Sequence, residues 1–265
     1  MSNRYGIAAC AEGRLRAAGI DSARADARIL IEHARGDATL LERSLSRREQ
    51  YEPVAYIIGH KEFWSLEFEV GRGVLVPRPE TETLIEEALR EFPVRTAPLQ
   101  FLDLGAGSGC VLVAALSEYP NAFGTAVESS FDAIAWLRKN IANHRMEDRC
   151  VIRLDDWAGI SGQFDAIFSN PPYVSASEMA KLPPDVVRYE PESALIAGAD
   201  GLAAFRDLAP HIAKCLKPDG KVFLELGRGQ APMVSAILQS AGLEVARIAT
   251  DLAGIERCVV AARAA

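Results

Sequence analysis

The chain has 265 residues, of which 49% are hydrophobic and 25% charged, and its formal net charge is −7. This length and apolar content predict one large domain plus a small one, built around a substantial core. The acidic balance disfavours nonspecific nucleic-acid binding and direct nucleic-acid readout, because phosphate contacts need clustered Lys and Arg. The five cysteines lack metal-binding spacing, so we predict no metal site and expect free thiols in a reducing, cytoplasmic compartment. The N-terminus has no signal-peptide pattern and no apolar run is long enough to span a bilayer, so no membrane association is expected.

Three segments follow one another along the chain. Apolar residues at helical spacing, with an N-cap signal at Asp21-Ser22, predict a helical domain over residues 1–50. Residues 51–75 change to aromatic and β-branched content, which predicts a hairpin linker. Residues 76–265 form the third and largest segment, which includes a helix from Thr81 to about Glu91.

Strands and helices alternate through the third segment. Apolar runs predict strands near residues 99–104, 122–128, 149–154, 164–169 and 221–226, with Pro218-Asp219-Gly220 as a tight turn before the last of these. Two further strands, 243–248 and 256–261, are expected as an antiparallel pair at the sheet edge. The pattern predicts an α/β fold with a doubly wound, Rossmann-like sheet.

The first strand of this segment leads into a glycine loop, Leu104-Gly105-Ala106-Gly107-Ser108-Gly109-Cys110. The spacing is G-x-G-x-G, which does not meet the dinucleotide pattern G-x-G-x-x-G, and the Walker lysine is missing. A ligand with an adenosine and an amino-acid tail but no pyrophosphate fits better, which indicates S-adenosyl-L-methionine. Gly105 and Gly107 would let the backbone approach that ligand closely.

Acidic and aromatic residues follow the next two strands. Glu128 ends the second strand about 20 residues past the glycine loop, where such folds bind ribose hydroxyls. Asp155-Asp156-Trp157 follows the third strand, where an acid accepts from an adenine amine and an indole covers the ring. Each signal is weak alone, but the series at successive strand ends is strong.

The fourth strand ends at Asn170-Pro171-Pro172-Tyr173. Proline has no N–H, so the ladder stops there and leaves the Asn170 side-chain carbonyl and the Pro171 backbone carbonyl free. Two adjacent acceptors suit a planar NH2 group: they hold both hydrogens and turn the nitrogen lone pair toward an electrophile. Tyr173 would stack on the flat substrate. A Pro-rich turn capped by Asn is the plain structural alternative.

With these motifs in series, the chain resembles class I methyltransferases that act on amino or amide nitrogens, and more narrowly the HemK/PrmC family. The resemblance also covers Glu52-Pro53, Glu62-Phe63-Trp64, the Val76 to Glu82 segment and the Val187 to Pro191 segment. That family methylates N5 of the glutamine in the Gly-Gly-Gln motif of peptide-chain release factors. The resemblance implies that the chain is an S-adenosyl-L-methionine-dependent enzyme, with a release factor as partner and a substrate-recognising N-terminal domain.

The resemblance also implies site residues. It assigns cofactor binding to Asp103, Gly105, Ala106, Gly107, Ser108, Gly109, Glu128, Asp156, Trp157 and Asn170. It assigns catalysis and substrate binding to Asn170, Pro171, Pro172 and Tyr173, with Arg188 and Glu190 as further substrate-binding residues.

The helical segment before Glu52-Pro53 is shorter than usual for this family by about one helix, and Glu128 stands where many relatives carry Asp. Three other functions therefore stay open. They are N-methylation of a small-molecule or free amino-acid amide or guanidine, methylation of a ribosomal-protein glutamine, and a catalytically silent binding module. The intact glycine and Asn-Pro-Pro-Tyr motifs disfavour the last.

Overall fold

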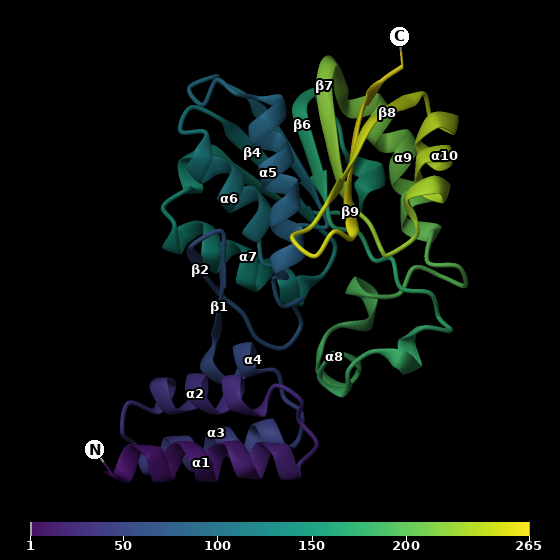
Figure 1. Ribbon diagram of the computed structural model, residues 1–265. Helices are drawn as coiled ribbons and strands as arrows, with labels where there is room; N and C mark the ends of the chain where they lie inside the picture. Colours follow the sequence, from purple (N-terminus) through teal and green to yellow (C-terminus); the bar gives the residue numbers. More distant parts are fainter. Residues whose placement is uncertain (1, 265) are drawn as a thin grey trace.

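The computed structural model describes residues 2–264, with side chains from residue 6 onward. Three helices form a separate layer at the N-terminus, at the bottom of Figure 1: α1 (Ser2–Ala17), α2 (Ala23–Ala34) and α3 (Ala38–Glu49). They bury their own apolar cluster, centred on the fully buried Leu15 and Leu30. No helix in the described part of the chain is long and apolar enough to cross a membrane.

The segment after these helices differs in part from the expected hairpin. It opens with a short helix, α4 (Val54–Ile58), before the hairpin of β1 (His60–Phe63) and β2 (Leu66–Glu69). Trp64 and Ser65 both adopt positive φ, the geometry of a two-residue type I′ turn that matches strand twist. The Trp64 backbone N–H donates to Glu82 and its indole N–H to Glu118, so the turn is attached to the larger domain.

The larger domain is built on a seven-stranded sheet of order β5-β4-β3-β6-β7-β9-β8. All pairs are parallel except those of β9, which runs antiparallel to both β7 and β8. The strand order reverses between β3 and β6, and such a switch point opens a ligand crevice at the carboxyl ends of the strands. The predicted doubly wound α/β fold is confirmed. The strands are β3 (Gln100–Leu104), β4 (Phe123–Glu128), β5 (Cys150–Leu154), β6 (Phe164–Ser169), β7 (Leu216–Glu225), β8 (Leu243–Thr250) and β9 (Glu256–Arg263).

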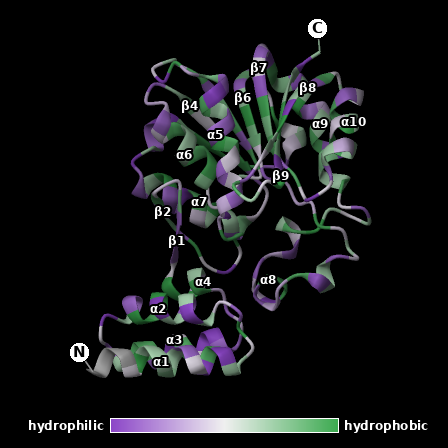
Figure 2. Cartoon of the chain, viewed as in Figure 1, coloured by the Kyte–Doolittle hydropathy of each residue, from purple (hydrophilic) through white to green (hydrophobic). Residues whose placement is uncertain are grey.

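Helices cover both faces of this sheet, and its central strands are the hydrophobic interior in Figure 2. One face packs against α5 (Glu82–Glu91), α6 (Cys110–Glu118) and α7 (Phe131–Asn143). The other face packs against α9 (Ala203–Cys215) and α10 (Ala231–Ser240). Short elements complete the chain: η1 (Pro79–Thr81), η2 (Glu147–Arg149), η3 (Trp157–Gly159), η4 (Met179–Lys181), α8 (Pro184–Tyr189) and η5 (Glu192–Ala194).

The fifth strand corrects one expectation. Pro218-Asp219-Gly220 does not precede the strand as a turn, because β7 already begins at Leu216. Phe164 pairs with Leu216 and Ala166 with Lys221, so the Pro-Asp-Gly sequence lies in a bulge where the ladder skips residues. Proline has no N–H to give to the ladder, and a bulge accommodates it inside a strand.

Asn140 on α7 joins three parts of the molecule. Its side chain is fully buried, accepts from the backbone N–H of Glu69 at 2.7 Å and donates to the Glu69 carbonyl at 3.0 Å. It also donates to the Ser108 carbonyl at 2.9 Å. One amide therefore fixes the hairpin strand β2 to the glycine loop through α7.

We expect Asn140→Ala to lower the free energy of unfolding by about 2–4 kcal/mol, because it leaves buried backbone groups of Glu69 and Ser108 without partners. Urea denaturation followed by circular dichroism measures this. Asn143→Ala is the matched control: Asn143 is exposed on the same helix, and its loss should cost less than about 0.5 kcal/mol. Equal losses in the two variants would contradict the joining role of Asn140.

Candidate functional site

The four predicted motifs meet at one edge of the sheet. The strands β5, β4, β3 and β6 are parallel neighbours, so their carboxyl ends face the same side. The glycine loop follows β3, Glu128 ends β4, Asp156 and Trp157 follow β5, and Asn170 follows β6. The structure therefore gathers motifs that lie as many as 65 residues apart in sequence, from Gly105 to Asn170.

The three loop glycines serve two purposes. All have positive φ: +75° at Gly105, +55° at Gly107 and +83° at Gly109. A Cβ at Gly105 would meet no atom within 4 Å, and one at Gly107 would meet only Val74 at 3.9 Å, so both border open space. A Cβ at Gly109 would lie 2.6 Å from Leu137 of α7. Gly109 is therefore required by helix packing, whereas Gly105 and Gly107 leave room for a ligand.

Glu128 holds the loop in this conformation. Its side chain is 8% exposed; one carboxylate oxygen accepts from the Gly107 N–H at 2.8 Å and the other from the Ser130 N–H at 2.8 Å. The Gly105 and Ala106 N–H groups both donate to the Val127 carbonyl. Ala106 and Ser108 are buried and contribute through their backbone.

Asp103 lies behind the loop, near the end of β3, and is 2% exposed. Its Oδ2 atom is buried with no hydrogen-bond partner in the described residues. Burial, followed by repulsion from Glu128, raises the pKa of Asp103 to about 7. This uncompensated acid behind an open glycine cradle fits a ligand that carries a positive charge. S-adenosyl-L-methionine is such a ligand, so the residues present fit it.

The Asp156-Trp157 pair is more exposed than the loop. Asp156 is exposed and caps η3 by accepting from the Ala158 N–H at 3.0 Å. Trp157 is half-buried, packs against the apolar cluster on the α9 side, and its indole N–H donates to Asp207. The indole face is thus held at this edge by a residue of α9 that the sequence did not indicate.

Asn170 belongs to a buried hydrogen-bond chain. Its amide Nδ2 donates to Thr81 Oγ1 at 3.1 Å, and the Thr81 hydroxyl donates to Glu225 Oε2 at 2.5 Å. The other Glu225 oxygen accepts from the Tyr173 hydroxyl at 3.1 Å. No donor among the described residues reaches Asn170 Oδ1, which therefore remains available as an acceptor.

The rest of the motif is held by its backbone. Within residues 2–264 the Pro171 carbonyl receives no hydrogen bond. The Tyr173 carbonyl accepts from Gln230 Nε2 at 2.9 Å, and Gly201 approaches the same carbonyl so closely that a Cβ would lie 2.5 Å away. Pro171 is buried, and Pro172 and Tyr173 are half-buried.

The segment after the motif forms a loop closed at both ends. At its base, Val174 and Ile196 form a parallel bridge. At its far side, Arg188 lies over the Tyr51 ring at 5.1 Å and the Tyr189 hydroxyl donates to the Gln50 carbonyl at 3.0 Å. In Figure 1 the α8 part of this loop extends toward the N-terminal helices.

Glu190 and Arg188 differ in accessibility. Glu190 is buried at 6% exposure, paired with Arg78 at 2.6 Å and hydrogen-bonded to the Val76 N–H at 3.2 Å. It fixes the loop and is not open to a bound partner. Arg188 is exposed at the loop surface.

Five contributors were missed by sequence reasoning: Thr81, Glu225, Gln230, Asn140 and Asp207. Glu225 did carry a signal, because it is a charged residue that ends the apolar run Val222-Phe223-Leu224 of a central strand. Thr81, Gln230 and Asn140 carry no such signal, since their roles depend on partners more than 30 residues away.

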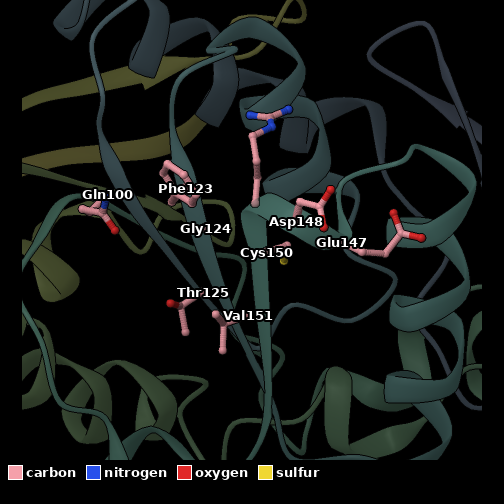
Figure 3. A pocket seen from close by; sticks show the side chains of 9 residues that line it. Gln100, Phe123, Gly124, Thr125, Glu147, Asp148, Cys150 and Val151 are labelled. Atoms are coloured by element: carbon pink, nitrogen blue, oxygen red, sulfur yellow. The ribbon is translucent and has the colours of Figure 1, made fainter.

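A pocket of about 410 Å³ lies elsewhere (Figure 3). Gln100, Phe123 and Cys150, among its lining residues, mark the beginnings of β3, β4 and β5. It is therefore at the amino ends of the strands, on the edge opposite to the glycine loop and Asn170. None of the predicted site residues lines it.

Comparison with known proteins gives one family match and many close relatives. Residues 82–186 match the methyltransferase small domain. The release factor glutamine methyltransferase of Caulobacter vibrioides is 40% identical over 94% of this chain and 93% of its own length. That of Cereibacter sphaeroides is 41% identical over 94% of both chains. Each of these two alignments leaves only 6% of this chain unaligned. The three N-terminal helices occupy a larger share of the chain than that, so each alignment includes part of the helical segment.

Solved structures support the fold. A methyltransferase from Pyrococcus furiosus superposes with a TM-score of 0.55 at 20% identity, over 77% of this chain and 92% of its own. A ribosomal protein L11 methylase from Lactobacillus delbrueckii subsp. bulgaricus superposes with a TM-score of 0.54 at 18% identity, over 74% and 84%.

We expect Gly107→Val to abolish binding of S-adenosylhomocysteine in isothermal titration calorimetry, because the side chain enters the open cradle. The positive φ adds about 1–2 kcal/mol of backbone strain, which needs a control. Gly254→Val supplies it: Gly254 has φ +76°, no atom within 4 Å of a Cβ, and a place in the turn between β8 and β9. Affinity should be lost in the first variant and retained in the second; retention in both would contradict this placement.

The affinity for S-adenosylhomocysteine should also rise with pH between about 6 and 8. With a pKa of about 7, Asp103 is mostly protonated at pH 6 and mostly ionised at pH 8, and the ionised form favours a ligand bearing an ammonium group. One linked proton limits the gain to about tenfold per pH unit. Asp103→Asn should bind more weakly at pH 8 with little pH dependence. An unchanged slope in this variant would show that another group is responsible.

Proposed function

This chain belongs to the release factor glutamine methyltransferase family, and we propose that it methylates the side-chain amide nitrogen N5 of the Gly-Gly-Gln glutamine in a peptide-chain release factor. The methyl donor is S-adenosyl-L-methionine. The observation that carries the choice of acceptor is the Asn170 amide, whose nitrogen is engaged with Thr81 and whose oxygen is free.

The donor would be held by the glycine loop and by the acids around it. Gly105 and Gly107 would give the backbone its close approach, Glu128 would accept from the ribose hydroxyls, and Asp103 would add a negative potential for the positively charged end. Asp156 and Trp157 would hold the adenine. When bound, this cofactor supplies an electrophilic methyl group attached to a sulfonium.

Asn170 and Pro171 prepare the acceptor nitrogen. Asn170 Oδ1 and the Pro171 carbonyl each accept one hydrogen of the substrate NH2 group, which opposes conjugation of the nitrogen with its own carbonyl. The lone pair would then be turned away from these two acceptors and toward the glycine loop, and positioned polar groups of this kind contribute a large share of catalytic rate enhancement. The chain needs no strong base, because the nitrogen becomes acidic only after it has been alkylated.

A protein acceptor fits the surroundings of this motif. The loop over residues 174–198 lies between Tyr173 and the N-terminal helices, with Arg188 exposed on it. We propose that this loop and the helical layer form the entrance for the release factor, with Glu190 and Arg78 fixing the loop. The net charge of −7 favours a protein over a nucleic acid as the partner, and release factors act in the cytoplasm.

The direct test incubates the purified chain with a release factor and methyl-labelled S-adenosyl-L-methionine, and locates the label by mass spectrometry. Label on the Gly-Gly-Gln glutamine is the expected result. Free glutamine, a small amide and ribosomal proteins serve as competing acceptors. Label on one of these, with an unlabelled release factor, would replace the proposed acceptor.

Asn170→Ala should reduce the methyl-transfer rate by about 100- to 1,000-fold at saturating substrates, because it removes one positioned acceptor from the reacting NH2 group. Affinity for S-adenosylhomocysteine should stay within a few-fold, since the glycine loop and Glu128 are intact. Single-turnover kinetics and calorimetry measure the two effects. Wild-type turnover in this variant would refute the role of Asn170.

A further inference from the structure

A fully buried carboxylate lies close behind the Asn-Pro-Pro-Tyr motif. Glu225, the last residue of β7, is 0% exposed, and no Lys or Arg among the described residues forms an ion pair with it. Its hydrogen bonds come from two hydroxyls, those of Thr81 and Tyr173. An apolar residue would fill such a site without the cost of desolvating a charge.

While Glu225 is ionised, the hydrogen bonds from Glu225 through Thr81 to Asn170 can run in one direction only. An ionised carboxylate only accepts, so the single hydroxyl hydrogen of Thr81 must point to Glu225. The Thr81 oxygen can then only accept, and the Asn170 atom beside it, 3.1 Å away, must be the amide nitrogen. The two ends of an Asn amide are otherwise nearly equal in size and shape, so sterics alone would not select between them.

We propose that Thr81 and Glu225 are positioning residues that set the orientation of the Asn170 amide, so that its oxygen and not its NH2 group faces the acceptor nitrogen. This inference rests on the proposed function, because only an NH2 acceptor requires an oxygen there. The reversed amide would present hydrogens to the substrate hydrogens and repel them. Tyr173 takes the second Glu225 oxygen, so one carboxylate orients two residues of the motif.

The charge on Glu225 links this orientation to pH. Burial raises the pKa of Glu225 to about 7, and Glu80 adds to the rise while Arg257 opposes it. The other titratable groups nearby, Tyr173, Cys110 of α6 and Cys258 of β9, have pKa values raised by burial and stay neutral in this range. Protonation gives Glu225 a hydrogen to donate to Thr81. The Thr81 hydroxyl is then free to donate to Asn170, which draws the Asn170 oxygen toward Thr81 and favours the reversed, unproductive orientation.

Thr81→Val tests the proposal with nearly constant volume. The rate of methyl transfer at saturating cofactor and release factor should fall about 10- to 100-fold, as is common for residues that orient a ligand-contacting group. The KM for the release factor should change little, and Thr81→Ser should restore most of the rate because it keeps the hydroxyl. Thr83→Val is the matched control: Thr83 is buried at 4% exposure in the adjoining helix and makes no side-chain hydrogen bond in the described structure.

The pH profile separates orientation from mere stability. At cofactor concentrations that saturate the site at every pH, so that titration of Asp103 does not limit binding, the wild-type single-turnover rate should fall about tenfold per pH unit below pH 7. In Glu225→Gln, the new amide neither gains nor loses a proton in this range, so a single protonation state sets the rate. That rate should then be independent of pH between 6 and 8. A slope identical to that of the wild type would overturn the role of Glu225.

A second measurement needs no acceptor. The Asn170 side-chain NH2 signal in a ¹⁵N-labelled sample, assigned by its absence in Asn170→Ala, should exchange slowly in the wild type and Thr83→Val and quickly in Thr81→Val. The inference is overturned if the Asn170 NH2 group exchanges equally fast in the wild type, Thr83→Val and Thr81→Val. It is also overturned if the wild type methylates a release factor and Thr81→Val does so at the same rate. A wild type that labels no release factor but keeps the exchange difference counts against the proposed function alone.

Discussion

Three buried carboxylates without a cationic partner are the constraint around which this site is arranged. Asp103, Glu128 and Glu225 are at most 8% exposed, and none forms an ion pair within the described residues. Glu128 and Glu225 are accommodated by N–H and hydroxyl donors, and each donor is thereby fixed in direction. The need of these carboxylates for hydrogen-bond donors therefore determines how the glycine-loop backbone, Thr81 and Tyr173 are oriented. Negative potential collects at the edge where a positively charged donor must lie.

That edge depends on remote parts of the chain. The Ser108 carbonyl of the glycine loop is bound by Asn140, which also binds β2 of the hairpin. The hairpin turn is attached through Trp64 to α5 and α6. Thr81, which contacts Asn170, directly precedes α5. The hairpin linker is therefore a structural support of the site as well as a connection between two layers.

The sequence predicted the fold and the order of the motifs well, because both follow from local patterns. Apolar runs of strand length and the G-x-G-x-G spacing are readable without knowing which residues meet. The bulge at 218–220 was misread because a Pro-Asp-Gly sequence has the same local signal whether it ends a strand or interrupts one. Thr81, Gln230 and Asn140 were missed for a related reason, since an ordinary polar residue gains its role only from distant partners.

The cofactor-binding residues could be predicted from the sequence more directly than the substrate-binding residues. Gly105, Gly107 and Glu128 lie where the motif predicts, although Gly109 serves helix packing against Leu137. Glu190 was expected at the substrate, yet its burial against Arg78 makes it a support of the loop. A charged residue in a loop reads as exposed unless its partner, here more than 100 residues away, is known.

The loop over residues 174–198 has a mechanical consequence. Its near end continues directly from Tyr173, and its far side is tied to the N-terminal helices through Tyr51 and Gln50 and through Arg48, which lies 3.5 Å from Asp185. The loop thus connects the small domain to the Asn-Pro-Pro-Tyr motif. The small domain and Tyr173 are therefore joined through one loop that is anchored at both ends, so a displacement of the helices relative to the sheet would have to break or stretch these contacts.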